Sequence, residues 1–254
     1  MKDFLFYIVI ALIITQLATI FTWLYRIGLV RLANPNPALK VFYKISAYFQ
    51  LFNTLMHELF HIFMAYCTFN KGYKIELTSD RAGSAVTSAR NKFSVILIKL
   101  SGYTGASLFV VFFMTMLNLN LYRELLYIIG GILIFSLIFY VRNAFGVYWC
   151  ILMALALSSV AYYGSDGLLI NVIKLLGAIL VVESIASTVT IVNLSIKHPK
   201  EISDSSDLAK LTKIPSIIWS IFFLAFAVYC SAKGYQIAYA EPISSLQELF
   251  SILF

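Results

Sequence analysis

An apolar segment at about residues 42–68 contains, near its middle, the stretch Leu55-Met56-His57-Glu58-Leu59-Phe60-His61-Ile62-Phe63. Residues four apart lie on one face of an α-helix, so the imidazoles of His57 and His61 can converge on one cation. Zn²⁺ accepts such nitrogens together with a carboxylate and keeps a position for water. Glu58 lies at the neighbouring edge of this face, where it can take a proton from a water that attacks a carbonyl and pass it to the leaving amine. The stretch therefore predicts a hydrolytic metal site.

The composition places this segment in a membrane protein. Of the 254 residues, 61% are hydrophobic and 12% are charged, with 19 basic and 12 acidic residues and a formal net charge of +7. The mean hydropathy is +0.86. A soluble domain is about half apolar and roughly a quarter charged. The composition therefore excludes a soluble enzyme, a disordered chain and a disulfide scaffold, and it indicates a polytopic membrane protein.

The apolar runs are continuous, about 20 residues long and without two-residue alternation, which favours helices over the strands of a barrel. We expect an all-α polytopic membrane protein, a bundle of about six or seven transmembrane helices that forms a single domain over residues 1–254. The seven predicted spans cover approximately residues 4–25, 42–68, 93–118, 123–141, 145–163, 168–195 and 214–233.

Two connecting loops are long and polar, at about 69–92 and 196–213. In the first, the β-prone runs 73–78 and 84–88 flank Ser79-Asp80-Arg81-Ala82-Gly83, which predicts a short β-hairpin directly after the histidine-bearing helix. Both loops are rich in basic residues, which favours a cytoplasmic amino terminus and contacts with the lipid bilayer. No Lys/Arg run is dense enough to predict a nucleic-acid partner. The three cysteines lie in apolar stretches and predict no disulfide framework.

A zinc site needs a third protein ligand, and the sequence offers several carboxylates. Asp207 is the preferred candidate, because the end of the second span and the start of the last span lie on the same membrane face. Asp204 is close by, and Glu183 and Asp166 remain alternatives. Asp207 could instead cap the amino terminus of a helix.

Further motifs follow the histidines: the hairpin with Gly83, the small-residue segment Ser101-Gly102-Tyr103-Thr104-Gly105, Arg142-Asn143 with Phe145-Gly146, and Ser206-Asp207-Leu208-Ala209 with Thr212, Ile214-Pro215 and Trp219. Together with the histidine motif they resemble the site-2 protease family of intramembrane zinc metalloproteases, in particular its compact bacterial branch without a PDZ domain. The resemblance covers about residues 50–220. Phe60 is a departure, because the family commonly has Gly before the second histidine. The N-P-D-G or L-D-G segment of the better-known branches is absent.

The resemblance implies that His57, His61 and Asp207 bind Zn²⁺, that Glu58 is the catalytic base, and that the substrates are membrane-embedded proteins or peptides. It also implies a location in the bacterial cytoplasmic membrane. A helical substrate must unwind before cleavage, and the hairpin could offer an edge strand that pairs with it, or could be an ordinary loop. The segment 102–106 could pack tightly against the metal-bearing helix or simply pack the bundle. Asn143 could orient a substrate carbonyl or cap a helix.

The sequence thus predicts a zinc-dependent intramembrane endopeptidase. One alternative is a non-proteolytic membrane protein in which the metal has a structural or sensory role. Another is a transporter in which the intramembrane histidines and glutamate relay protons or metal ions. The sequence shows neither inverted repeats nor paired broken helices that would support a transporter.

Overall fold

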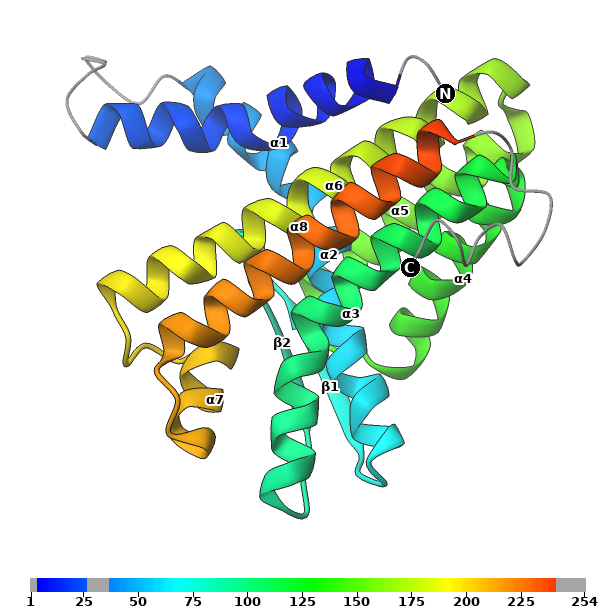
Figure 1. Cartoon of the computed structure of the whole chain (residues 1–254). Coiled ribbons are helices and arrows are strands. Elements are labelled where there is room, and N and C mark those ends of the chain that lie inside the picture. The colour runs from blue at the N-terminus through cyan, green and yellow to red at the C-terminus, as the bar shows by residue number, and fades with distance from the viewer. Residues whose placement is uncertain (1–3, 27–36, 241–254) are drawn as a thin grey trace.

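The computed structural model describes residues 4–26 and 37–240, and within these ranges it contains eight helices and one β-hairpin (Figure 1). The elements are α1 (Phe4–Arg26), α2 (Pro37–Cys67), β1 (Gly72–Leu77), β2 (Gly83–Thr87), α3 (Lys92–Asn118), α4 (Tyr122–Phe139), α5 (Ala144–Tyr163), α6 (Asp166–Lys197), α7 (Asp204–Thr212) and α8 (Ser216–Tyr239).

The predicted all-α architecture and the hairpin after the histidine-bearing helix are confirmed. Each predicted span coincides with a helix to within a few residues at most ends, although α2 begins earlier and α8 continues to Tyr239. In the described part of the chain, α3, α4, α5, α6 and α8 are each long and apolar enough to cross a membrane. The chain is therefore a multi-pass membrane protein.

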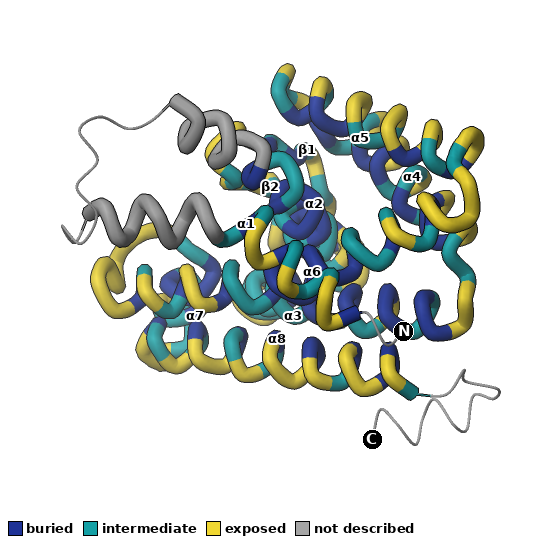
Figure 2. Tube along the Cα trace, turned by 90° about the horizontal axis from the view of Figure 1, so that it is seen from above, coloured by how far each residue is buried: buried dark blue, intermediate teal, exposed yellow. Residues whose placement is uncertain are grey.

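Helix α3 forms the centre of the bundle. It packs against α2 on one side and against α6 and α8 on the other (Figures 1 and 2). Its residues Val110, Phe113, Met114 and Leu117 are fully buried, and their spacing of three and four places them on one face of the helix. This apolar face packs against α6 and α8. The packing fixes the position of α3 and therefore of the polar residues at its amino end.

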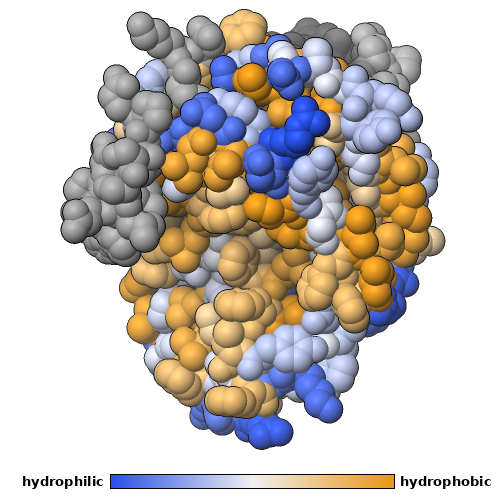
Figure 3. All heavy atoms as spheres, turned by 90° about the vertical axis from the view of Figure 1, so that its right-hand side faces the viewer, coloured by the Kyte–Doolittle hydropathy of each residue, from blue (hydrophilic) through white to orange (hydrophobic). Residues whose placement is uncertain are grey.

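The outer surface of the bundle is apolar. Figure 3 shows a face with hydrophobic side chains across its middle and hydrophilic side chains mainly near its upper and lower edges. The paired helices α4 and α5 carry many exposed large hydrophobic residues, among them Tyr127, Ile134, Ile138, Ile151 and Leu155. Exposed apolar surface of this extent suits contact with lipid rather than with water.

The hairpin is fixed at one edge and open at the other. Its strands pair antiparallel, with an irregularity between Gly72 and Lys74. The outer edge of β1 is bonded to the segment before α5: the Ile75 N–H donates to the Tyr140 carbonyl at 2.8 Å, and the Arg142 N–H donates to the Ile75 carbonyl at 3.2 Å. Among the described residues, no strand pairs with the other edge of β2.

The side chain of Asn143 completes this anchor. Its Nδ2 donates to the Leu77 carbonyl at 2.6 Å, and its Oδ1 accepts from the Leu77 N–H at 3.0 Å. Asn143 does occupy the N-cap position of α5, but its side chain makes no capping hydrogen bond. The amide holds the hairpin because its two polar atoms match the N–H and C=O groups that Leu77 directs away from β2.

The contact between α2 and α3 depends on Phe60, the residue that departs from the family pattern. Its ring lies over Gly105, where an added Cβ would be 2.1 Å from the Phe60 Cγ atom and 2.4 Å from Cδ1. The absence of a side chain at Gly105 therefore provides the space that the aromatic ring at Phe60 requires. The structure therefore shows that the small-residue segment 102–106 packs tightly against the histidine-bearing helix α2.

We expect Gly105→Ala to destabilise the protein by about 1–3 kcal/mol, because the added methyl group overpacks the Phe60 contact. Thermal unfolding of the purified protein in detergent measures this change. Gly130→Ala on α4 is the matched control, since a Cβ there meets no atom within 4 Å. In a Phe60→Ala background, Gly105→Ala should cost less stability than it does in the wild-type protein, because the ring that the methyl group meets is gone. Equal unfolding temperatures for the two glycine variants would contradict the proposed contact.

Candidate metal centre

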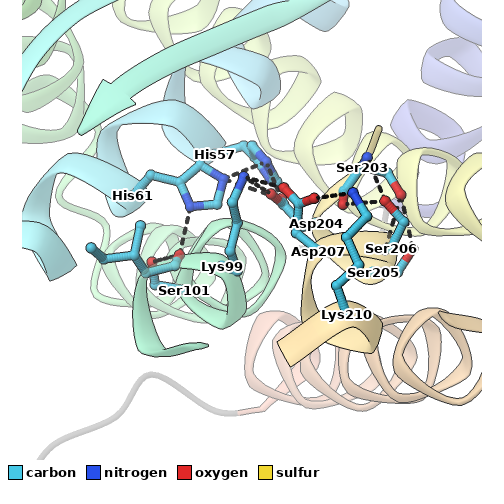
Figure 4. Close-up of polar contacts among 11 residues, drawn as sticks. His57, His61, Lys99, Ser101, Ser203, Asp204, Ser205, Ser206, Asp207 and Lys210 are labelled. Atoms are coloured by element: carbon cyan, nitrogen blue, oxygen red, sulfur yellow. Dashed lines mark hydrogen bonds and ion pairs between the residues drawn. The ribbon is translucent and has the colours of Figure 1, made fainter. Parts of the chain in front are cut away.

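Helix α2 positions two imidazoles next to each other. His57 and His61 are one helical turn apart, their ring centroids are separated by 4.5 Å, and their Nε2 atoms lie 2.9 Å apart (Figure 4). Glu58 and His61 are buried, with exposed fractions of 5% and 6%. The predicted convergence of the two histidines is therefore present in the fold.

Helix α7 brings a carboxylate to the same point. The Oδ2 atom of Asp204 lies 3.1 Å from the Nε2 atom of His57 and 3.1 Å from that of His61. Asp204 is the first residue of α7, and a capping box formed by Ser203 and Ser206 fixes the start of the helix. A contact of 3.1 Å between the hydroxyls of Ser205 and Ser195 joins this turn to α6.

The tautomer of His61 follows from its second contact. Its Nδ1 atom lies 2.6 Å from the carbonyl oxygen of Ile98, which can only accept a hydrogen bond, so Nδ1 carries the hydrogen. The Nε2 atom of the neutral ring then has a free lone pair, which is the form that binds a metal ion.

The spacing of the three atoms fits a metal ion. Zn²⁺ binds nitrogen and oxygen ligands at about 2.0–2.1 Å, which separates tetrahedral ligand atoms by about 3.3 Å. The observed separations of 2.9–3.1 Å between the atoms of His57, His61 and Asp204 are close to this value. In the parts of the chain that the structure describes, these residues are the one group of three potential ligands that converges in this way.

Gly102 on α3 allows the imidazoles to lie where they do. A Cβ atom at this position would be 2.5 Å from Cε1 of both His57 and His61. The next residue, Tyr103, stacks edge-on against His57 with ring centroids 4.4 Å apart. A single turn of α3 thus forms one wall of the site.

Asp204 is in the charged form that binds a cation. Burial by itself would raise the pKa of its carboxyl group, but interactions with His61 and His57 outweigh burial and hold this pKa well below its usual range. Lys99 adds a positive charge, with its Nζ atom 3.1 Å from Oδ1 of Asp204.

The other predicted candidates lie elsewhere. Asp207 belongs to the separate helix α7 rather than to the start of the last span, and it contacts Lys99 at 3.2 Å and Lys210 at 3.0 Å. Asp166 is exposed at the start of α6, 3.3 Å from Arg123. Glu183 accepts a hydrogen bond of 2.6 Å from Gln16. The structure therefore brings Asp204, and none of these three carboxylates, against the two imidazoles.

Sequence reasoning had a signal that favours Asp204. The pattern Ser203-x-x-Ser206 is a capping pattern, and it starts a helix at Asp204, where the carboxylate can project toward the bundle. Lys99 was missed entirely. A lysine inside an apolar span is costly unless it is paired or functional, and that cost was the available signal.

A cavity of about 660 Å³ with many polar side chains in its lining connects the metal-site residues, Glu58 and Glu183. It is lined by the metal-site residues and Glu58, by β2, and by polar residues of α6 that include Glu183 and Ser187. Glu58 lies beneath the start of β2, since a Cβ at Gly83 would be 2.9 Å from its Oε1 atom. The cavity is therefore large enough to hold water next to Glu58.

Comparison with known proteins agrees with this geometry. Residues 24–234 match the family model described as Peptidase M50B-like, which confirms the resemblance to the site-2 protease family. No curated protein and no solved structure matches the chain. Because the family match covers most of the sequence, including every residue of the candidate metal centre, the chain belongs to the Peptidase M50B-like family.

Proposed function

We propose that the protein is a zinc-dependent intramembrane endopeptidase that hydrolyses peptide bonds of membrane-embedded protein substrates. The supporting observation is the convergence of the His57, His61 and Asp204 ligand atoms beside Glu58, in a cavity inside a bundle of membrane-spanning helices. We further propose that this bundle lies in the bacterial cytoplasmic membrane with its amino terminus in the cytoplasm.

In this proposal, His57, His61 and Asp204 hold the metal ion. Three protein ligands leave one position of a tetrahedral site open, as catalytic zinc sites require. When bound, zinc supplies Lewis-acid chemistry, because it acidifies water and polarises a carbonyl group. Ile98 keeps His61 in the metal-binding tautomer through the hydrogen bond to Nδ1.

Glu58 is the proposed general base. Its carboxylate is buried and lies in the same cavity as the ligand atoms. It takes a proton from the attacking water and delivers this proton to the departing amine. The polar residues along the cavity supply a path by which water reaches a site surrounded by apolar helices.

The free edge of β2 is the proposed substrate-binding strand. Ile75 directs its backbone groups away from β2: its N–H donates to the Tyr140 carbonyl and its C=O accepts from the Arg142 N–H. Its partner in the register is Ala85. In an antiparallel ladder, both members of such a pair direct their backbone groups outward. The N–H and C=O groups of Ala85 therefore face the free edge, beside the cavity, where an unwound substrate can pair with them.

The assignment of the third ligand is tested by metal analysis. We expect purified Asp204→Ala to lose its bound zinc, because only two nitrogens remain at the site. Asp207→Ala is the matched control, from the same turn of α7, and should still bind one equivalent when zinc is in excess. If instead Asp207→Ala loses zinc and Asp204→Ala retains it, Asp207 is the ligand.

The role of Glu58 is tested with Glu58→Gln. The amide has nearly the same shape but cannot accept the proton, so we expect bound zinc to be retained and cleavage to fall by about 10²–10⁴-fold. Cleavage of a membrane-embedded substrate in reconstituted vesicles, together with zinc content, measures both quantities. A variant that keeps zinc and every cellular phenotype of the intact gene would favour the non-proteolytic alternative.

The role of the strand edge is tested with Ala85→Pro, which removes the outward N–H group without removing a bond to β1. Loss of one hydrogen bond to substrate, worth about 0.5–1.5 kcal/mol, should lower kcat/KM by about 2- to 12-fold. Zinc content should not change. Ala85→Gly, which keeps the N–H group, is the control, and equal activity of the two variants would contradict pairing at this edge.

A further inference from the structure

We propose that Lys99 is a positioning residue of the metal centre: it holds one oxygen of Asp204 so that the other oxygen faces the two histidines. Asp207, in turn, holds Lys99 in place. This inference rests on the proposed function, because it assigns a role to Lys99 at the same zinc site.

The two oxygens of Asp204 have different partners. Oδ1 lies 3.1 Å from the Nζ atom of Lys99, whereas Oδ2 lies 3.1 Å from the Nε2 atoms of both His57 and His61 (Figure 4). A hydrogen bond between two charged groups is about twice as strong as a neutral one, so the contact with Lys99 restrains the orientation of the carboxylate. Asp204 is thereby presented as a ligand through one oxygen.

Lys99 is itself held by a second carboxylate. Its Nζ atom lies 3.2 Å from Oδ2 of Asp207, and Oδ1 of Asp207 lies 3.0 Å from the Nζ atom of Lys210. The four side chains form a row of alternating charge that runs from the buried Asp204 to the exposed Lys210. Two ammonium groups balance two carboxylates, so this row brings no net charge into the low-dielectric site.

Neighbouring residues of α3 support two different ligands. The carbonyl of Ile98 accepts the hydrogen bond from Nδ1 of His61, and the side chain of Lys99 contacts Asp204. The Ser101 hydroxyl lies 3.0 Å from the carbonyl oxygen of Phe60, which ties this turn to α2. One turn of α3 therefore fixes a ligand of α2 and a ligand of α7 relative to each other.

The division of the two Asp204 oxygens has a chemical consequence. A carboxylate with both oxygens free can bind a metal ion through two atoms and occupy the position that a catalytic site needs for water or substrate. With Oδ1 engaged by Lys99, Asp204 supplies one ligand atom. Groups that orient ligands in this way typically affect metal affinity or activity by about 10–100-fold.

The experiment compares metal binding by wild-type protein, Lys99→Met, Lys99→Arg and Asp207→Asn, each purified and freed of metal. Lys99→Met should weaken Zn²⁺ binding by about 10–100-fold. In the Co²⁺-substituted protein, Lys99→Met should also replace the intense visible bands of four-coordinate cobalt by the weaker bands of a higher coordination number.

Lys99→Arg should keep the wild-type spectrum, and Asp207→Asn should weaken Zn²⁺ binding by less than Lys99→Met. Lys92→Met is the control, because Lys92 is exposed at the first turn of the same helix.

The outcomes separate this inference from the proposed function. If the wild-type protein binds no zinc, the proposed function fails. If it binds one equivalent, and Lys99→Met binds zinc as tightly and gives the same cobalt spectrum, the positioning role of Lys99 is overturned while the metal site stands. Should Lys99→Met fail to fold, Asp207→Asn decides: unchanged zinc affinity overturns the inference, and a weaker affinity supports it.

Discussion

Three potential ligand atoms held about 3 Å apart in a buried site are the constraint around which this protein is built. The Nε2 atom of His61 lies close to Nε2 of His57 and to Oδ2 of Asp204. When both rings are in the neutral form that binds a metal, with Nε2 unprotonated, these atoms repel one another unless a positive charge lies between them, and burial in a medium of low dielectric strengthens the repulsion. A cation among the three atoms removes this penalty. The surrounding structure must therefore hold the ligands firmly enough to receive it.

Helix α3 provides most of this rigidity, and it does so with its two ends. Toward its carboxyl end, the fully buried residues Phe113 and Met114 pack against α6 and α8. Toward its amino end, the turn from Ile98 to Gly102 contacts the imidazole rings of His57 and His61 and the carboxylate of Asp204. Packing of the apolar half thus fixes the position of the polar half, because the helix between them is continuous.

The sequence predicted the elements of the fold well, because their signals are local. Apolar runs of transmembrane length identified the long helices, and a turn flanked by two β-prone runs identified the hairpin. Helix α7 was not predicted within the loop at 196–213, since it is short and polar and its start depends on the capping box. The anchor between Asn143 and Leu77 was also beyond sequence reasoning, because these residues are far apart along the chain.

The metal centre, like the fold, was predictable from the sequence where its signal is local and not where it depends on packing. The spacing of His57 and His61 determined by itself that the two rings would share a face, since an α-helix returns to the same side after about four residues. The carboxylate that joins them comes from a helix far along the chain, and Asp204 and Asp207 lie on the same turn of that helix. Only the packing of α7 against α3 decided which of the two reaches the histidines and which pairs with Lys99, because that choice depends on how the helix is rotated rather than on any local pattern.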